Sequence, residues 1–155
     1  MRYLIDGCYG DGNVGDECLL LAVSQLIKRV DPDAQIAALT SDIEATEAET
    51  GVSAVAQCNP LGCNLYGSLV KGLLAKTLHE IRQSDVFVLG GGELFRDQPG
   101  YQAAFGMFYR MQLARRFGKT VLALGVGAQS PTRWWGNRVL RKAARACNAV
   151  VCRDN

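Results

Sequence analysis

The sequence lacks any long hydrophobic run. Its longest uninterrupted apolar segment is the six-residue stretch Cys18–Val23, whereas a membrane-spanning helix needs about 20 apolar residues. The amino terminus reaches Asp6 and Gly7 before an apolar segment of signal-peptide length has formed. We therefore expect no membrane span, no secretory signal and a cytoplasmic location.

Histidine is almost absent, and the cysteines lack a common metal-binding spacing. His79 is the only histidine and falls in a helical stretch, so no Ser/His/Asp catalytic set is suggested. No C-x2-C pair occurs among the six cysteines, which are Cys8, Cys18, Cys58, Cys63, Cys147 and Cys152. In a reducing compartment this pattern indicates buried free thiols. A four-cysteine zinc site of unusual spacing stays open as the alternative, and we predict no metal site.

Proline is scarce, with four residues among 155, while 48% of the residues are hydrophobic. This composition excludes a disordered or low-complexity chain. A chain of this length buries roughly 70% of its unfolded surface. We therefore expect one globular domain over residues 1–155, with no internal repeat and no linker.

The charge is unevenly distributed along the chain. Residues 1–60 carry a net charge of −7 and residues 61–155 a net charge of +9. Solvated helix faces explain this simply, but the basic half could also face a phosphorylated substrate or a membrane surface. The only basic-aromatic group is Arg133-Trp134-Trp135, which is more simply a helix start packed on the sheet. Nucleic-acid binding is therefore not expected.

Short apolar runs alternate with longer stretches of helical periodicity. The predicted strands are 3–5, 35–39, 52–56, 86–89, 121–124 and 149–152, and the predicted helices are 14–30, 41–51, 65–83, 100–117 and 134–146, with a loop over 58–64. Asn13 is expected to cap the first helix, Ser41 and Glu44 to form a capping box, and Gly51 to end the second helix. This alternation predicts an α/β fold: a doubly wound, mostly parallel six-stranded sheet with helices on both faces.

Two helices show a clear apolar spacing in the sequence. In the first helix we expect the core face to be Val14, Cys18, Leu19, Ala22, Leu26 and Val30. In the last helix we expect Trp135, Val139, Leu140, Ala143 and Ala144 to point inward, and Arg138, Arg141, Lys142 and Arg145 to point outward.

Three glycine-rich segments follow predicted strands. They are 6–17 after the first strand, 90–97 after the fourth and 125–131 after the fifth. In parallel sheets, ligands bind beyond the carboxyl ends of the strands. Glycine also lets a ligand approach backbone N–H groups closely. The three segments therefore predict one binding edge.

The first segment matches a dinucleotide fingerprint, Gly10-x-Gly12-x-x-Gly15, and Asp42 lies near the spacing of a ribose-binding acid. Four residues separate Ile5 from the first of these glycines, however, and Asp16 and Glu17 would repel a pyrophosphate at the helix start. Carboxylates suit a neutral ligand rich in hydroxyls better. A nicotinamide- or nucleotide-binding oxidoreductase domain stays as the alternative.

The other two glycine-rich segments carry side chains that could act in catalysis or bind a ligand. Glu93 and Asp97 could orient or deprotonate a hydroxyl, and Arg96 could hold a phosphate or carboxylate. Gln129 and Ser130 could hydrogen-bond a ligand. Surface ion pairing and turn formation are the simpler explanations of the same residues.

These segments together resemble the polysaccharide pyruvyl transferase family. The segment with Gly10, Asn13, Gly15, Asp16 and Glu17 resembles the family's opening G-x-x-N-x-G-D-E motif, and Gly90-Gly91-Gly92 with Asp97 is similar to its triple-glycine loop. Gly125-Val126-Gly127 and Arg153-Asp154 resemble the next two family elements. Ala128-Gln129-Ser130-Pro131 departs from the family, where a glycine-proline pair is common.

The resemblance implies one Rossmann-like half of a two-domain, glycosyltransferase-like architecture. It also implies transfer of a ketal-linked pyruvyl group from phosphoenolpyruvate to two hydroxyls of a sugar in a cell-surface polysaccharide precursor, with no cofactor. This half would bind the acceptor. The expected catalytic residues are Glu93 and Asp97, and the expected substrate-binding residues are Asn13, Asp16, Glu17, Gly91, Gly92, Gly125, Gly127 and Gln129. A second domain, a homo-oligomer or a role as a non-catalytic subunit stays open.

Overall fold

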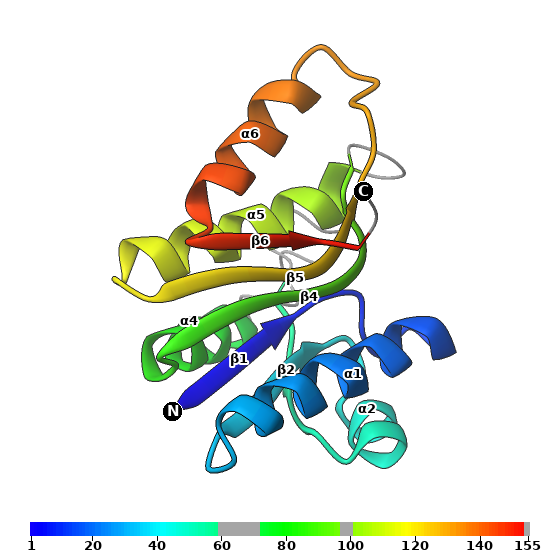
Figure 1. The fold of residues 1–155 in the computed structure, drawn as a ribbon, viewed down its shortest axis with the longest axis vertical. Coiled ribbons are helices and arrows are strands. Elements are labelled where there is room, and N and C mark those ends of the chain that lie inside the picture. Colours follow the sequence, from blue (N-terminus) through cyan, green and yellow to red (C-terminus); the bar gives the residue numbers. More distant parts are fainter. Residues whose placement is uncertain (59–71, 97–100, 154–155) are drawn as a thin grey trace.

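The computed structural model describes residues 1–58, 72–96 and 101–153 (Figure 1). Its elements are β1 (Arg2–Asp6), α1 (Val14–Val30), β2 (Gln35–Thr40), α2 (Ile43–Thr50), β3 (Ser53–Ala56), α4 (Leu73–Gln83), β4 (Val86–Phe95), α5 (Tyr101–Arg116), β5 (Thr120–Ala128), α6 (Gly136–Ala146) and β6 (Ala149–Cys152). The predicted order of strands and helices is confirmed. The predicted loop 59–64, helical residues 65–71 and residue 100 lie outside the described residues.

All six strands form one parallel sheet in the order β3-β2-β1-β4-β5-β6. This confirms the predicted α/β, Rossmann-like fold. The order reverses between β1 and β4, and ligands of such sheets bind at this switch point, beyond the strand carboxyl ends.

Apolar side chains bury both faces of the sheet. On one face Leu20 and Val23 of α1 pack on Ile5 and Val88. On the other face Ile81 of α4, Met111 of α5 and Ala143 of α6 pack around Phe87 and Val121. In the described residues no helix combines the length and the apolar character needed to cross a bilayer.

Helix α1 buries a different face from the predicted one. Its buried residues are Glu17, Leu20, Val23, Ser24 and Ile27. Val14, Cys18, Ala22, Leu26 and Val30 are exposed instead, and Leu19 is half-buried. The helix carries two apolar stripes, and spacing alone cannot decide which of them meets the sheet. In α6 the predicted inward position of Ala144 is also wrong, because this residue is exposed.

The observed helix caps match the predicted ones except at the start of α2. Asn13 caps α1 by accepting the Gly15 N–H at 3.1 Å, and Gly51 ends α2 in the left-handed conformation. The cap of α2 is Asp42, whose Oδ1 accepts the Ala45 N–H at 3.1 Å. The predicted capping box is therefore wrong, because Ser41 lies before the helix and its hydroxyl bonds to the segment after β1.

Candidate functional site

Most of the second and third glycine-rich segments is strand and not loop. β4 continues to Phe95 and so contains Gly90, Gly91, Gly92 and Glu93, while β5 continues to Ala128 and contains Gly125 and Gly127. Gly90 pairs with Leu124 and Gly92 with Val126 across the two strands. Part of the backbone that was expected to face a ligand thus belongs to the sheet. The predicted strand ends were wrong because glycine content was taken as a mark of loops.

The β4 glycines are required by close packing. A Cβ on Gly90 would lie 2.9 Å from the Tyr9 hydroxyl, which donates to the Gly90 carbonyl at 2.5 Å. A Cβ on Gly91 would lie 2.8 Å from the Leu19 Cβ, and its φ of +71° suits glycine. These glycines let the first segment and α1 lie directly against β4.

The expected site residues Asn13 and Asp16 lie together at the start of α1. The Asn13 amide donates from Nδ2 to Asp16 Oδ2 at 2.8 Å, while its Oδ1 caps Gly15. A Cβ on Gly92 would lie 3.6 Å from Asp16 Oδ1, so this carboxylate reaches the end of β4. The first and second segments therefore meet at Asp16 and Gly92.

Glu17 turns inward, away from where a ligand would approach. It is 5% exposed, and its Oε1 accepts the Gly10 N–H at 2.7 Å. Its Oε2 is buried and has no hydrogen-bond partner within the described part of the chain. Glu17 thus ties the segment after β1 to α1, and its expected contact with substrate stays a prediction.

Glu93, Arg96, Gln129 and Arg153, here called the Glu93 cluster, gather at the carboxyl ends of β4, β5 and β6. Gln129 Nε2 donates to Glu93 Oε2 at 2.7 Å. The guanidinium groups of Arg96 and Arg153 each lie 3.8 Å from a Glu93 carboxylate oxygen. The Glu93 side chain is 40% exposed, so it is open to a ligand. Of the predicted residues, Asp97 lies outside the described residues.

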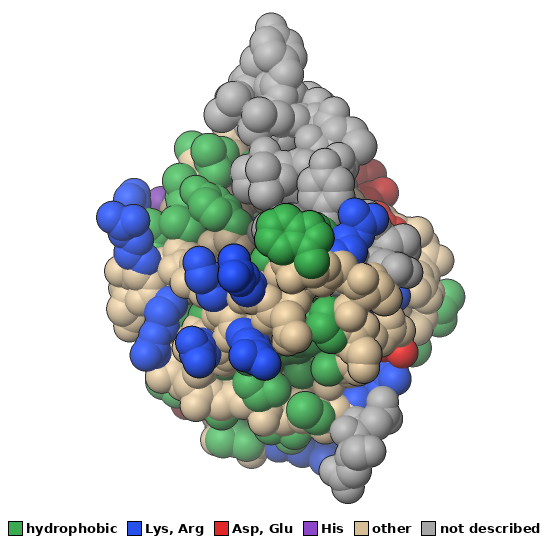
Figure 2. All heavy atoms as spheres, turned by 90° about the horizontal axis from the view of Figure 1, so that it is seen from above, with side chains coloured by type: hydrophobic (Ala, Val, Ile, Leu, Met, Phe, Trp, Pro, Cys, Tyr) green, Lys and Arg blue, Asp and Glu red, His purple; other side chains and the backbone are tan. Residues whose placement is uncertain are grey.

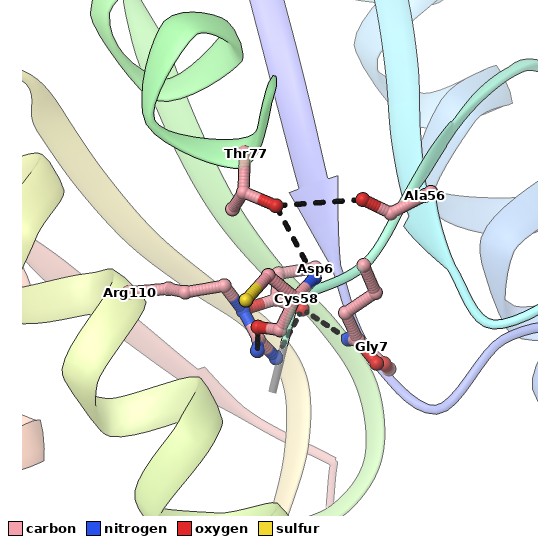
Figure 3. Close-up of polar contacts among 7 residues, drawn as sticks. Asp6, Gly7, Ala56, Cys58, Thr77 and Arg110 are labelled. Carbon is pink, nitrogen blue, oxygen red and sulfur yellow. Dashed lines mark hydrogen bonds and ion pairs between the residues drawn. The ribbon is translucent and has the colours of Figure 1, made fainter. Parts of the chain in front are cut away.

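A buried ion pair lies on the other side of the switch point, and sequence reasoning missed it (Figure 3). Arg110 of α5 donates from Nε and Nη2 to the two carboxylate oxygens of Asp6 at 2.8 and 3.0 Å, and both side chains are almost fully buried. Arg110 Nη1 also donates to the Cys58 carbonyl at 2.8 Å. One signal was available: Arg110 lies on the same helical stripe as Met107, Met111 and Ala114, all buried.

Arg110 of this ion pair also lines a polar pocket of about 290 Å³. The pocket is lined by Gly7, Cys8, Asp11, Ser41, Gln57, Met107 and Arg110, from the ends of β1, β2 and β3 and from α5. Gln57 Nε2 donates to Asp6 Oδ1 at 3.0 Å and to the Gly7 carbonyl at 3.1 Å, which fixes the amide. Burial, followed by the charges of Asp16 and Asp6, raises the pKa of the Cys8 thiol, which favours the thiol over the thiolate.

The geometry at the start of α1 disfavours a dinucleotide. Two backbone N–H groups of the fingerprint segment are already used, since Gly10 donates to Glu17 and Gly15 donates to Asn13. A Cβ on Gly10 would lie 2.5 Å from the Asp42 nitrogen, so this glycine packs on the end of β2. Among the described residues no group of three or more His, Cys, Asp or Glu side chains could hold a metal ion.

Comparisons with known proteins agree with this description. Residues 13–155 match the sequence profile of a family described as polysaccharide pyruvyl transferase. No curated protein matches the chain. Among solved structures, the chain is similar to a dodecameric FMN-dependent UbiX-like decarboxylase from Escherichia coli O157:H7, with 13% identity and a TM-score of 0.50 over 98% of this chain and 79% of that one. At this identity the likeness shows the fold alone.

Proposed function

Because the chain belongs to the polysaccharide pyruvyl transferase family, we propose that it contributes the acceptor side of pyruvyl transfer from phosphoenolpyruvate to a sugar of a cell-surface polysaccharide precursor. The observation that carries this proposal is the approach of Asp16 to Gly92, the residue before Glu93, near the carboxyl end of β4. It places two carboxylates, which accept hydrogen bonds from sugar hydroxyls, at the edge where such sheets bind ligands.

The reaction joins two sugar oxygens to C2 of phosphoenolpyruvate and breaks the C2–O bond to phosphate. One hydroxyl proton goes to C3, which becomes a methyl group, and the other leaves with inorganic phosphate. A carboxylate beside the acceptor hydroxyls can take the proton as the C–O bond forms. We assign this role to Glu93, which is half-exposed and oriented by Gln129. Asp97 is a second candidate from the sequence.

The remaining groups of the edge supply binding. Asn13 and Asp16 offer an amide and a carboxylate to ring hydroxyls, and Arg96 and Arg153 beside Glu93 can approach an anionic donor. The polar pocket over β1–β3 combines fixed hydrogen-bonding groups with the apolar Met107, a combination that suits a sugar ring. A donor site completed by a further domain or a second copy, and a cytoplasmic location, belong to the same proposal.

The test is a ligand titration followed by thermal unfolding, run in parallel with an assay for phosphate release. The protein is titrated with phosphoenolpyruvate, with nucleotide sugars and with oligosaccharides. A ligand at 100 times its dissociation constant stabilises the folded state by about 2.7 kcal/mol. We expect a sugar ligand to raise the unfolding temperature of the wild-type protein.

Site variants make this test specific. D16N and E93Q should reduce the sugar-induced shift at least severalfold while leaving the unliganded unfolding temperature nearly unchanged, because both carboxylates are at least partly exposed. The matched control is D33N, an equal change of charge at an exposed residue before β2, at the opposite edge of the sheet. An unchanged shift in both site variants, or an equal loss in D33N, contradicts the assignment.

A further inference from the structure

The carboxy-terminal third of the chain is unusually one-sided in charge. Residues 98–153 contain ten Lys and Arg residues and no Asp or Glu. Arg110 is buried in its ion pair and Arg153 lies in the Glu93 cluster. These two contacts do not account for the other eight basic residues, and four of those eight lie on α6.

Helix α6 separates its apolar and basic residues sharply. Ala143 and Ala146 are buried, and Ala143 belongs to the core on that face of the sheet. The basic residues Arg138, Arg141, Lys142 and Arg145 recur at intervals of three and four, which places them on one stripe, and all four are exposed. We call this stripe, together with Arg115 of α5, the α6 basic face. Figure 2, which looks down on the side where α6 lies, shows Lys and Arg side chains spread over this part of the surface.

The basic face is not neutralised from within the described structure. Among the described residues, the side-chain ion pairs use Glu80, Glu93 and Asp6, and none involves the four α6 cations. Like charges held together without a counterion repel one another. An anionic partner would relieve this repulsion by supplying the opposite charge.

The cations are held on a fixed scaffold. Gln112 Nε2 of α5 donates to the Lys142 carbonyl at 3.1 Å, and Arg115 Nη1 donates to Asn148 Oδ1 at 3.1 Å. Between the two helices lies a groove of about 370 Å³ lined by Gln112, Arg115, Lys142, Arg145 and Ala146. A concave site with three cations suits a phosphate group of a lipid.

An exposed indole stands at one end of the same helix. Trp134 precedes α6 and is 84% exposed, the most exposed large hydrophobic residue described. The expectation that this tryptophan starts a helix and packs on the sheet is therefore wrong. A tryptophan next to arginines is typical of protein segments that bind a bilayer surface. The ring enters the headgroup layer, and the cations contact lipid phosphates. α6 begins at the carboxyl edge of the sheet, so Trp134 lies at the edge that carries the Glu93 cluster.

We propose that the α6 basic face and Trp134 dock this protein on an anionic lipid bilayer. A nucleic acid is the less favoured partner, because single strands are bound by several aromatic rings stacked along a basic groove, and here one exposed ring stands at the end of the basic stripe. Docking along α6 brings the carboxyl edge next to the bilayer surface. This inference does not depend on the proposed function.

Vesicle co-sedimentation of the full chain tests the proposal. The protein should sediment with vesicles of phosphatidylcholine and phosphatidylglycerol, remain in solution with phosphatidylcholine alone, and be released from the anionic vesicles by salt. R141Q/R145Q should weaken binding to the anionic vesicles by about fivefold for each cation removed, since each contributes about 1 kcal/mol. W134A should also weaken binding to the anionic vesicles and reduce the quenching of tryptophan fluorescence by brominated lipids, because only Trp135 then remains.

The matched control is R29Q/K76Q, which removes the same charge from exposed positions on α1 and α4. Thermal unfolding of each variant checks that the fold is retained. The proposal is overturned if anionic vesicles do not bind the wild-type protein, or if R141Q/R145Q loses no more affinity than the control. If the wild-type protein binds single-stranded RNA and not anionic vesicles, the proposal is overturned in favour of a nucleic-acid surface.

Discussion

At the scale of single residues, the ion pair between Asp6 and Arg110 should matter most for stability. Replacing Arg110 by Met leaves the Asp6 carboxylate buried and without its cation. Loss of one partner of such a pair destabilises a protein by about 3–5 kcal/mol. We expect R110M to lower the free energy of unfolding by this amount in urea denaturation. The double variant D6L/R110M should recover most of the loss, and a single variant as stable as the wild type would contradict the structure.

Cysteine reactivity gives a second prediction at this scale. Burial raises the pKa of the Cys8 and Cys147 thiols, so at a given pH less of each is thiolate, the reactive form. Cys18 and Cys152 are exposed, so the expectation of buried thiols is wrong for these two. Near neutral pH iodoacetamide should modify Cys18 and Cys152 first, and the rate at Cys8 should still be rising above the ordinary thiol pKa. Mass spectrometry resolved by site measures this order, and equal rates at Cys8 and Cys18 would contradict it.

Residue types and their spacing predicted part of the candidate site. Asn13 was expected as a cap and is one, and Glu93 and Gln129 were expected at one edge and share a hydrogen bond. The inward turn of Glu17 could not be predicted, because its partner is a backbone N–H whose position depends on the path of the whole segment. The pairing of Asp6 with Arg110 joins residues 104 positions apart, a separation that no local pattern reports.

At the scale of elements, α1 shows what periodicity leaves undecided. Leu20 is fully buried against the sheet, whereas Leu26, on the other apolar stripe, is 49% exposed. L20A should therefore destabilise the fold by about 2–5 kcal/mol. L26A, the same change on the same helix, should stay within about 0.5 kcal/mol of the wild type. Chemical denaturation of the two variants checks this, and a larger loss in L26A would show that the sequence-based face was right.

The ends of the strands were also difficult to predict from the sequence. The sequence did not predict the order of the strands within the sheet. Six strands in a mostly parallel sheet could be predicted, because apolar runs alternate with helices. The ends of β4 and β5 could not, since Gly90 and Gly91 remain in the strand for a reason that only packing shows: Tyr9 and Leu19 leave no room for a side chain.

At the scale of the whole molecule, the strand order is that of dinucleotide-binding sheets, yet a fold does not determine a ligand. The decisive contacts are local. Gly10 and Gly15 direct their N–H groups to Glu17 and Asn13, and Asp16 adds a negative charge to the first turn of α1 that repels a pyrophosphate. We therefore expect NAD and NADP, titrated to saturating concentrations, to leave the unfolding temperature unchanged. D16N removes one repelling charge but leaves both N–H groups occupied, so it too should show no shift. A shift with NAD in the wild-type protein would mean that the segment after β1 opens to release these N–H groups, and it would favour the oxidoreductase alternative over acceptor binding.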